Sequence, residues 1–218
     1  SKSKPENCMV PPSGIVEDLV PVDRGGRMIH ELRAYDLKPG SGPDYLAMFV
    51  RQGMGAVTRH LPMAGYWLTD SGALNRLYHL WIYRDLEERT AARAGLARDR
   101  DWNDDFVPRA FPLIVRQRNV LMSLTAGSDA MARAQAERRA HHPNLGADTP
   151  IFAAGLQCLT ERDAAGNEDG ASLIARWRVI SGDEPGRVLS LWQGDGLGLA
   201  ERFRRHELLR PIAASPLR

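Results

Sequence analysis

Two alternating segments constrain the fold of this chain more than any other feature. Residues 28–37 read Met-Ile-His-Glu-Leu-Arg-Ala-Tyr-Asp-Leu, and residues 76–83 read Arg-Leu-Tyr-His-Leu-Trp-Ile-Tyr. Successive side chains of a β-strand point to opposite faces, so each segment is predicted to be a strand with two different faces. The charged and aromatic side chains share one face of each strand: Glu31, Arg33, Tyr35, His79, Trp81 and Tyr83. This combination is more typical of a polar pocket than of a plain core.

Composition indicates an ordinary globular protein. The chain has 218 residues, with 43% hydrophobic and 26% charged residues, which suits one large domain or two small ones. The net charge is +2 and the basic residues are scattered among acidic ones, so we expect no nucleic-acid partner. Cys8 and Cys158 form no CxxC motif, which fits a reducing compartment. No apolar run is long enough to cross a bilayer and no signal-peptide core is present, so we expect a soluble, cytoplasmic protein without membrane contact.

The first half of the chain predicts a β-α-β-β-α-β order, which is that of a ferredoxin-like domain. A Pro- and Gly-rich turn follows the first strand, and Asp85 with Glu88 forms a capping-box pattern at the start of the second helix. The predicted elements are strand 28–37, helix 44–61, strand 64–69, strand 76–83, a helix from 85 to about 98, and strand 113–124.

The second half reads as a degenerate copy of the first. Its predicted elements are strands 151–161, 172–180 and 187–192 and a helix at 199–209, with a loop at 163–170 where the first half has a helix. Trp177 falls where Trp67 does in the first copy. The predicted domains are an extended arm at 1–27, a first domain at 28–125, a helical linker at 126–149 and a second domain at 150–218. The arm either packs on a partner subunit or is an unstructured leader.

Several motifs of the first half, in order and spacing, resemble those of the NIPSNAP family. They are Ile29-x-Glu31-Leu32-Arg33-x-Tyr35-x-Leu37-x-Pro39-Gly40, then Gly65-Tyr66-Trp67, then Leu74-Asn75-x-x-x-His79-Leu80-Trp81-x-Tyr83-x-x-Leu86-x-x-Arg89. The resemblance covers residues 28 to about 120, and the tail Ser215-Pro216-Leu217-Arg218 is similar to that of bacterial members. It is weak over the second half, where Ser190 replaces His79.

The resemblance implies an α+β fold, a tandem ferredoxin-like dimeric α/β-barrel. Two four-stranded sheets, each with helices on one face, would close around a central cavity. The second sheet would come from the second half of the chain or from another subunit, so we expect a homodimer or a pseudo-dimer. Relatives of this fold include cofactor-free monooxygenases, haem-degrading enzymes, lyases, isomerases and proteins with no known reaction, so the fold by itself selects no chemistry.

The resemblance also predicts which face of each strand lines the cavity. Leu32, Leu80 and Ile82 are expected to face the helices, and the polar and aromatic set is expected to face the cavity. In the enzyme hypothesis His79 or Glu31 moves protons, and Arg33 and Asn75 hold an oxyanion or carboxylate. The flat side chains that would shape the pocket are Tyr35, Trp67, Trp81 and Tyr83. The alternative is that Glu31 and Arg33 form a structural salt-bridge network.

The remaining histidines are weaker candidates. His60 ends the first helix and either contributes to the site, as a base or a ligand, or interacts with the helix dipole. A lone His ligates haem in some relatives of this fold, but no local motif marks such a site. His141 and His142 are neighbours without a third ligand at helical spacing, so no metal site is predicted. The glycine-rich residues 194–198 lack the context of a phosphate loop.

Two hypotheses of function follow. The first is a cofactor-independent enzyme that performs a cyclisation, isomerisation or oxygenation on a small, partly aromatic substrate, in natural-product biosynthesis. The second is a non-catalytic ligand-binding or protein-interaction member of the same family. Neither hypothesis requires a metal or a cofactor.

Overall fold

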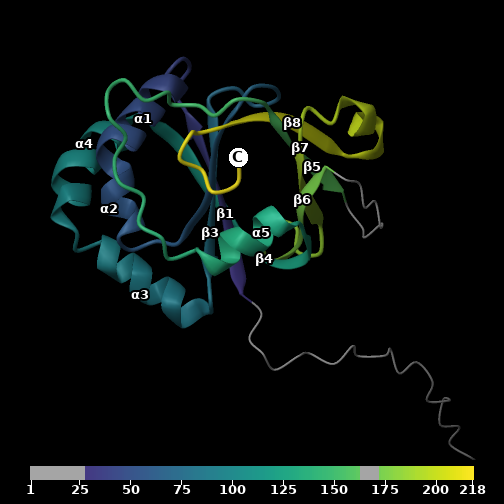
Figure 1. The fold of residues 1–218 in the computed structure, drawn as a ribbon, viewed down its shortest axis with the longest axis horizontal. Helices are drawn as coiled ribbons and strands as arrows, with labels where there is room; N and C mark the ends of the chain where they lie inside the picture. Colours follow the sequence, from purple (N-terminus) through teal and green to yellow (C-terminus); the bar gives the residue numbers. More distant parts are fainter. Residues whose placement is uncertain (1–27, 163–171) are drawn as a thin grey trace, which may run out of the picture.

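Eight strands close into one barrel in the computed structural model, which describes residues 28–162 and 172–218 (Figure 1). The strand order around the barrel is β1-β3-β2-β8-β5-β7-β6-β4, and all neighbours pair antiparallel. The strands are β1 (Ile29–Leu37), β2 (Met63–Thr69), β3 (Arg76–Tyr83), β4 (Ile114–Gly127), β5 (Gln157–Arg162), β6 (Leu173–Gly182), β7 (Val188–Gln193) and β8 (Arg205–Pro211). The predicted arm at 1–27 and the predicted loop at 163–170 lie outside the described residues.

The helices are short and most of them belong to the first half. They are α1 (Gly42–Met48), the π-helical η1 (Phe49–Gly53), α2 (Met54–Thr58), α3 (Leu86–Leu96), the π-helical η2 (Asp101–Phe106), α4 (Val107–Ala110), the 3-10 turn η3 (Phe111–Leu113), α5 (Asp129–Ala136) and the 3-10 turn η4 (Leu197–Arg202). Among the described residues, no helix is long and apolar enough to cross a membrane.

The first half confirms the predicted β-α-β-β-α-β order. Helix α3 begins at the predicted cap, where the Asp85 side chain accepts a hydrogen bond from the Glu88 backbone N–H at 2.7 Å. The predicted helix at 44–61 is divided by the π-helical η1, and the helical pair η2 and α4 lies between the second predicted helix and the strand predicted at 113–124. These π-helical segments were not predicted, because a one-residue change of helical period leaves no clear mark on a short apolar pattern.

The second half has four strands, so the helix predicted at 199–209 is wrong. Only the short turn η4 is helical there, and residues 205–211 form strand β8 between β2 and β5. The local sequence is rich in helix formers, but closing the barrel requires a strand at this place, and tertiary context overrides propensity. The predicted strand at 151–161 also begins later, at Gln157. With β8 included, the second half has the strand order β8-β5-β7-β6, which is equivalent to β4-β1-β3-β2 in the first half.

The barrel closes within a single chain, which answers the question that the sequence left open. The two halves join where β4 pairs with β6 and where β2 pairs with β8, with Trp67 opposite Pro211 and Thr69 opposite Leu209. The C-terminal tail reinforces the second junction, because the Leu217 N–H donates to the Ala64 carbonyl at 3.0 Å. A second subunit is therefore not needed to complete the sheet.

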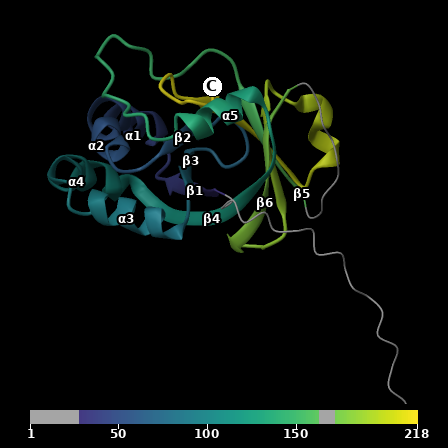
Figure 2. The ribbon, with the colours of Figure 1, turned by 60° about the horizontal axis from the view of Figure 1, so that its bottom comes forward.

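The helices cover one side of the barrel, and this inverts the predicted faces. Helices α1 to α4 gather on the side of β1 and β3, and strands β5 and β6 lie on the opposite side (Figures 1 and 2). Leu80 and Ile82 pack inside the barrel with Trp67 and Trp177, not against the helices as expected. The opposite faces of these strands carry Tyr35, Trp81 and Tyr83 into a separate core beneath the helices.

The middle of the barrel is filled by apolar side chains, so the described residues enclose no large central cavity there. Leu32, which was expected to face the helices, lines a gap of about 10 Å³ in this middle layer. Its other lining residues are Trp67, Tyr78, Leu80, Leu159, Trp177, Leu191 and Leu209. A gap of this size is too small for a substrate.

Candidate functional site

The candidate site lies between the sheet and the helices. A cavity of about 230 Å³ has β1 and β3 as its floor, with α1, η1, α2 and η2 above. Its lining is mainly aromatic, with a few polar groups: Arg33, Tyr35, Tyr45, Phe49, Val57, Leu61, Tyr66, His79, Trp81, Arg93, Leu96, Trp102, Phe111 and Gln117. An aromatic cavity with a small number of polar groups is the usual form of a small-molecule site.

His79 lies at the centre of this floor with a fixed tautomer. The Trp81 indole N–H donates to His79 Nδ1 at 2.7 Å, and because an indole nitrogen can only donate, Nδ1 must accept. The hydrogen of the neutral ring is therefore on Nε2, which is buried and has no hydrogen-bond partner among the described residues. Burial, followed by the charge of Arg33, lowers the pKa of His79 well below its usual value of 6.5. His79 is thus a neutral hydrogen-bond donor.

The ring of His79 is held between two tyrosines. The Tyr66 ring stacks on it with centroids 4.9 Å apart, and the Tyr35 ring meets it edge-on at 4.6 Å. Only 3% of the His79 surface is exposed. This packing fixes the direction of the Nε2–H group before any ligand binds.

Glu31 is the centre of a buried charge cluster beside the cavity. Its carboxylate accepts hydrogen bonds from Arg89 at 2.9 Å, Arg93 at 2.7 Å and Asn119 at 2.8 Å, and Arg33 lies 3.5 Å away. Burial alone would raise the pKa of Glu31, but the hydrogen bonds from Arg89 and Arg93 and the nearby positive charges outweigh it and lower the pKa to about 2. Glu31 is therefore ionised and fully engaged, which favours the structural alternative over proton transfer.

The charges of this cluster do not balance. Three arginines surround one carboxylate, which leaves a net charge of +2 next to the cavity. The Nε–H groups of Arg33 and Arg93 are buried without an acceptor, and both residues line the cavity. A ligand that brings a negative charge would meet these donors.

The tyrosines add further donors. Burial raises the pKa of Tyr35, Tyr45 and Tyr66, so all three phenols keep their protons at neutral pH. Together with His79 and Arg33 they give a site whose polar groups donate hydrogen bonds. No lining residue is a carboxylate.

The structure brings together only part of the predicted set. His79, Arg33, Tyr35 and Trp81 line one cavity, although it is on the helix side and not inside the barrel. Trp67 faces the barrel interior, where its indole N–H donates to Gln157 at 2.6 Å.

The other predicted site residues lie outside the cavity lining. Tyr83 is buried on the same side, and its hydroxyl has no hydrogen-bond partner among the described residues. Asn75 has a φ of 59° in a turn, where its side chain accepts a hydrogen bond from the Gly42 N–H at 3.3 Å. His60 lies in a separate surface hollow and pairs with Asp99 at 2.8 Å.

Sequence comparisons show which family the first half of the chain resembles. A sequence model of the NIPSNAP family matches residues 30–129. A solved NIPSNAP family protein of unknown function from Agrobacterium tumefaciens is 31% identical, and the match covers 48% of this chain and 94% of that chain, with a TM-score of 0.46. The chain belongs to the NIPSNAP family.

Mammalian relatives match over a smaller part of their length. The mouse NipSnap homolog 3B is 37% identical over 79 residues, and the human NipSnap homolog 3A is 31% identical over 98 residues. These matches span 32% and 39% of the two relatives.

The sequence did not predict the part of the candidate site that the helical segments and strand β2 supply. The lining residues with aromatic or charged side chains that were not predicted are Tyr66 on β2 and, on the helical segments, Tyr45, Phe49, Arg93, Trp102 and Phe111. One signal was present, because Arg89 and Arg93 are four residues apart and must share one face of helix α3. Two arginines on a helix face that packs on a sheet require a buried carboxylate, which points to Glu31. The described residues hold no group of three or more His, Cys, Asp or Glu side chains suited to a metal ion.

Proposed function

We propose that this NIPSNAP protein binds a small aromatic molecule in the cavity between the sheet and the helices, and stabilises negative charge on an oxygen of that molecule. The observation that carries the proposal is His79 Nε2–H, a buried donor with a fixed direction and no partner among the described residues. An unsatisfied buried donor costs about 1–3 kcal/mol, which an oxygen acceptor of a ligand would recover.

The size and walls of the cavity support an aromatic ligand. An apolar cavity of about 150 Å³ is sufficient to hold benzene, so about 230 Å³ accommodates one substituted ring. Phe49, Trp81 and Trp102 offer flat surfaces for it. The net positive charge of the Glu31 cluster favours a carboxylate, phenolate or enolate over a neutral substituent.

As an enzyme, the site suits a reaction whose transition state places charge on that oxygen. Donors positioned in a dry pocket stabilise such charge, and a neutral imidazole can act as the electrophile. The lining residues include no free carboxylate to act as a base. We therefore favour an isomerisation or a cofactor-independent oxygenation of a substrate that enters as an anion or loses its proton to solvent.

The lack of a base among the lining residues also favours the second candidate, a ligand-binding protein without catalysis. Both candidates use the same donors, and they differ only in whether a bound molecule is converted. The homodimer, the cytoplasmic location and the division into domains at 28–125 and 150–218 also remain proposals, which sedimentation analysis, localisation of the native protein and separate expression of each half would test.

Benzoate binding tests the proposal. Trp81 and Trp102 line the cavity, so their fluorescence should report titration with benzoate and, as a neutral comparison, benzyl alcohol. We expect His79→Phe to keep the stacked ring but to weaken benzoate binding at least tenfold, because a hydrogen bond to a charged group contributes about 1.5–3 kcal/mol. His79→Gln, which retains an N–H donor, should restore part of the affinity. Equal benzoate affinity in the wild type and His79→Phe, both folded by circular dichroism, would refute the role of His79.

Proton exchange then separates the two candidates. Phenylpyruvate is an aromatic acid that forms an enolate, and its exchange in D2O is visible by NMR. Faster exchange with the wild type than with His79→Phe supports an enzyme that stabilises enolates. Binding of phenylpyruvate without faster exchange supports the binding protein.

A further inference from the structure

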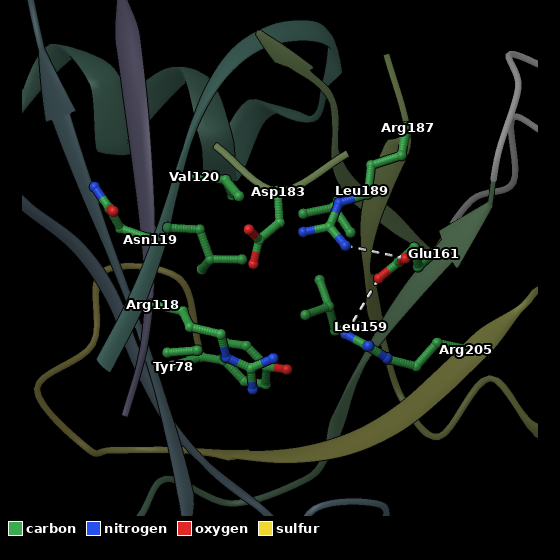
Figure 3. Close-up of a pocket in the computed structure, with 12 residues that line it drawn as sticks. Tyr78, Arg118, Asn119, Val120, Leu159, Glu161, Asp183, Arg187, Leu189 and Arg205 are labelled. Atoms are coloured by element: carbon green, nitrogen blue, oxygen red, sulfur yellow. Dashed lines mark hydrogen bonds and ion pairs between the residues drawn. The ribbon is translucent and has the colours of Figure 1, made fainter. Parts of the chain in front are cut away.

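A second cavity lies inside the barrel, toward the end of β4 that is remote from α5. It has a volume of about 60 Å³ (Figure 3). It is separate from the site described above, because Leu32 and Ala34 of β1 line it, whereas Arg33 and Tyr35 on the opposite face of β1 line the other cavity. Its lining combines apolar and charged side chains: Leu32, Ala34, Tyr78, Arg118, Asn119, Val120, Leu159, Glu161, Asp183, Arg187, Leu189 and Arg205. We call this cavity the barrel-mouth cavity.

The floor of the barrel-mouth cavity is apolar and closed. Leu32, Leu159 and Leu189 come from β1, β5 and β7. Leu32 and Leu159 also border the filled middle layer of the barrel, so the cavity has no continuation below them. A ligand would therefore enter from one end and place an apolar part against the leucines.

The rim of the barrel-mouth cavity carries three guanidinium groups. Figure 3 shows Arg118 of β4, Arg187 just before β7 and Arg205 of β8 turned toward the cavity. Glu161 is already paired with Arg187 at 3.1 Å and with Arg205 at 3.2 Å.

Two of these arginines keep buried donors that no described residue uses. The Nε–H groups of Arg118 and Arg187 have no hydrogen-bond acceptor among the described residues. Other nitrogens of the same side chains are engaged, since Arg118 pairs with Asp36 at 3.3 Å and Arg187 with Glu161. Both side chains are thus held in place while the buried Nε–H group of each has no acceptor among the described residues.

Two lining residues carry a negative charge that would repel an anion, Glu161 and Asp183. Glu161 is paired with arginines, whereas Asp183 forms no ion pair with another lining residue. It is exposed, in the hairpin between Gly182 and Glu184, whose φ angles of 107° and 52° turn the chain sharply. Figure 3 shows its carboxylate pointing into the cavity, with no hydrogen bond or ion pair to another lining residue. Because it is at the surface, it can be replaced without disturbing the core.

We infer that the barrel-mouth cavity binds a short-chain monocarboxylate, with its alkyl end on the leucine floor and its carboxylate on the Nε–H groups of Arg118 and Arg187. By the scale on which about 150 Å³ holds the six carbons of benzene, a volume of about 60 Å³ holds about two to three carbons. The alkyl ends of propionate and butyrate match that volume, with the carboxylate at the open rim beside the arginines. The apolar floor argues against inorganic phosphate, which would leave it uncovered and its own oxygens partly unpaired.

Propionate titration by isothermal calorimetry tests this site, with propionamide as the neutral ligand of the same shape. We expect saturable binding of propionate and at least tenfold weaker binding of propionamide. Asp183→Asn should bind propionate roughly threefold more tightly, because it removes an exposed like charge. Arg118→Gln should weaken binding at least tenfold, because it removes a charged donor. Asp105→Asn, an exposed change on η2, is the matched control and should leave the affinity unchanged.

Four results would overturn the inference. The first three are the absence of saturable propionate binding in both the wild type and Asp183→Asn, equal affinities for propionate and propionamide, and equal effects of Asp183→Asn and Asp105→Asn. Phosphate that competes with propionate at equal affinity would also overturn it, because the apolar floor would then have no role. The outcome is independent of the aromatic site, since benzoate binding and His79 variants report on the other face of β1.

Discussion

The charge cluster around Glu31 makes a quantitative prediction about stability. In the folded protein the pKa of Glu31 is about 2, against 4.5 in the unfolded chain. Each unit of pKa difference corresponds to about 1.4 kcal/mol, so the ionised carboxylate contributes about 3 kcal/mol at neutral pH. Because the folded pKa is the lower one, this contribution is complete above the unfolded pKa and is lost as the pH falls through the folded pKa. About half of it should be gone near pH 3.

Urea denaturation of the wild type and of Glu31→Gln at several pH values measures this contribution. At pH 7 the variant should be less stable by about 3 kcal/mol or more, because it also leaves three arginines without their common carboxylate. The difference should shrink steadily between pH 5 and pH 2.5. Asp105→Asn, which removes an exposed carboxylate, controls for the general effect of losing one negative charge.

Two outcomes would refute the reasoning. A stability difference below about 1 kcal/mol at pH 7 would mean that the cluster gives no net stabilisation after the cost of burying its charges. A difference that stays constant from pH 7 to pH 3 would mean that the Glu31 pKa is not lowered.

Three further predictions concern single side chains. Gly65→Ala should lower the free energy of unfolding, measured by urea denaturation, by about 1–3 kcal/mol, because a methyl group at this position overlaps the Trp67 ring. An unchanged midpoint of urea denaturation would contradict this close contact. Trp81→Phe should cost about 1–3 kcal/mol by the same assay, because it leaves His79 Nδ1 without its donor, and a loss below 0.5 kcal/mol would count against the fixed tautomer. Cys158 should resist a thiol reagent at pH 8 until urea unfolds the protein, since it is fully buried and burial raises its pKa to about 11; rapid labelling of the native protein would disagree.

Alternation along the strands predicted which side chains share a face, but it did not predict what covers that face. The set that includes Arg33, Tyr35, His79 and Trp81 does lie together, as expected. The prediction placed this set on the wrong side of the sheet. Every residue of β3 after Arg76 is buried, so both faces of the strand are covered. Hydrophobicity along the sequence therefore does not indicate which face points into the barrel and which faces the helices. Only the partners of these side chains, such as the arginines of α3, distinguish the helix side from the barrel interior.

The second half was harder to predict because its strands depend on distant partners. Residues 199–209 have a helical composition, and the repeat of the first half also suggested a helix after the preceding strand. Glu207 explains why a strand is formed instead. Inside the barrel it accepts a hydrogen bond from the Tyr78 hydroxyl at 2.6 Å and lies 3.5 Å from Arg76. Neither partner is near in sequence, so no local pattern could indicate this pairing.

The closing pair of β2 and β8 has a consequence for synthesis of the protein on the ribosome. Strand β2 is made early, but its partner, residues 205–211, emerges from the ribosome only after nearly all of the other described residues. Until then the apolar barrel-facing side chains of the first half, including Trp67 and Leu80, have no sheet to cover them. Nascent chains halted before residue 205 should therefore expose this surface and bind chaperones or aggregate, whereas chains released after residue 211 can close the barrel.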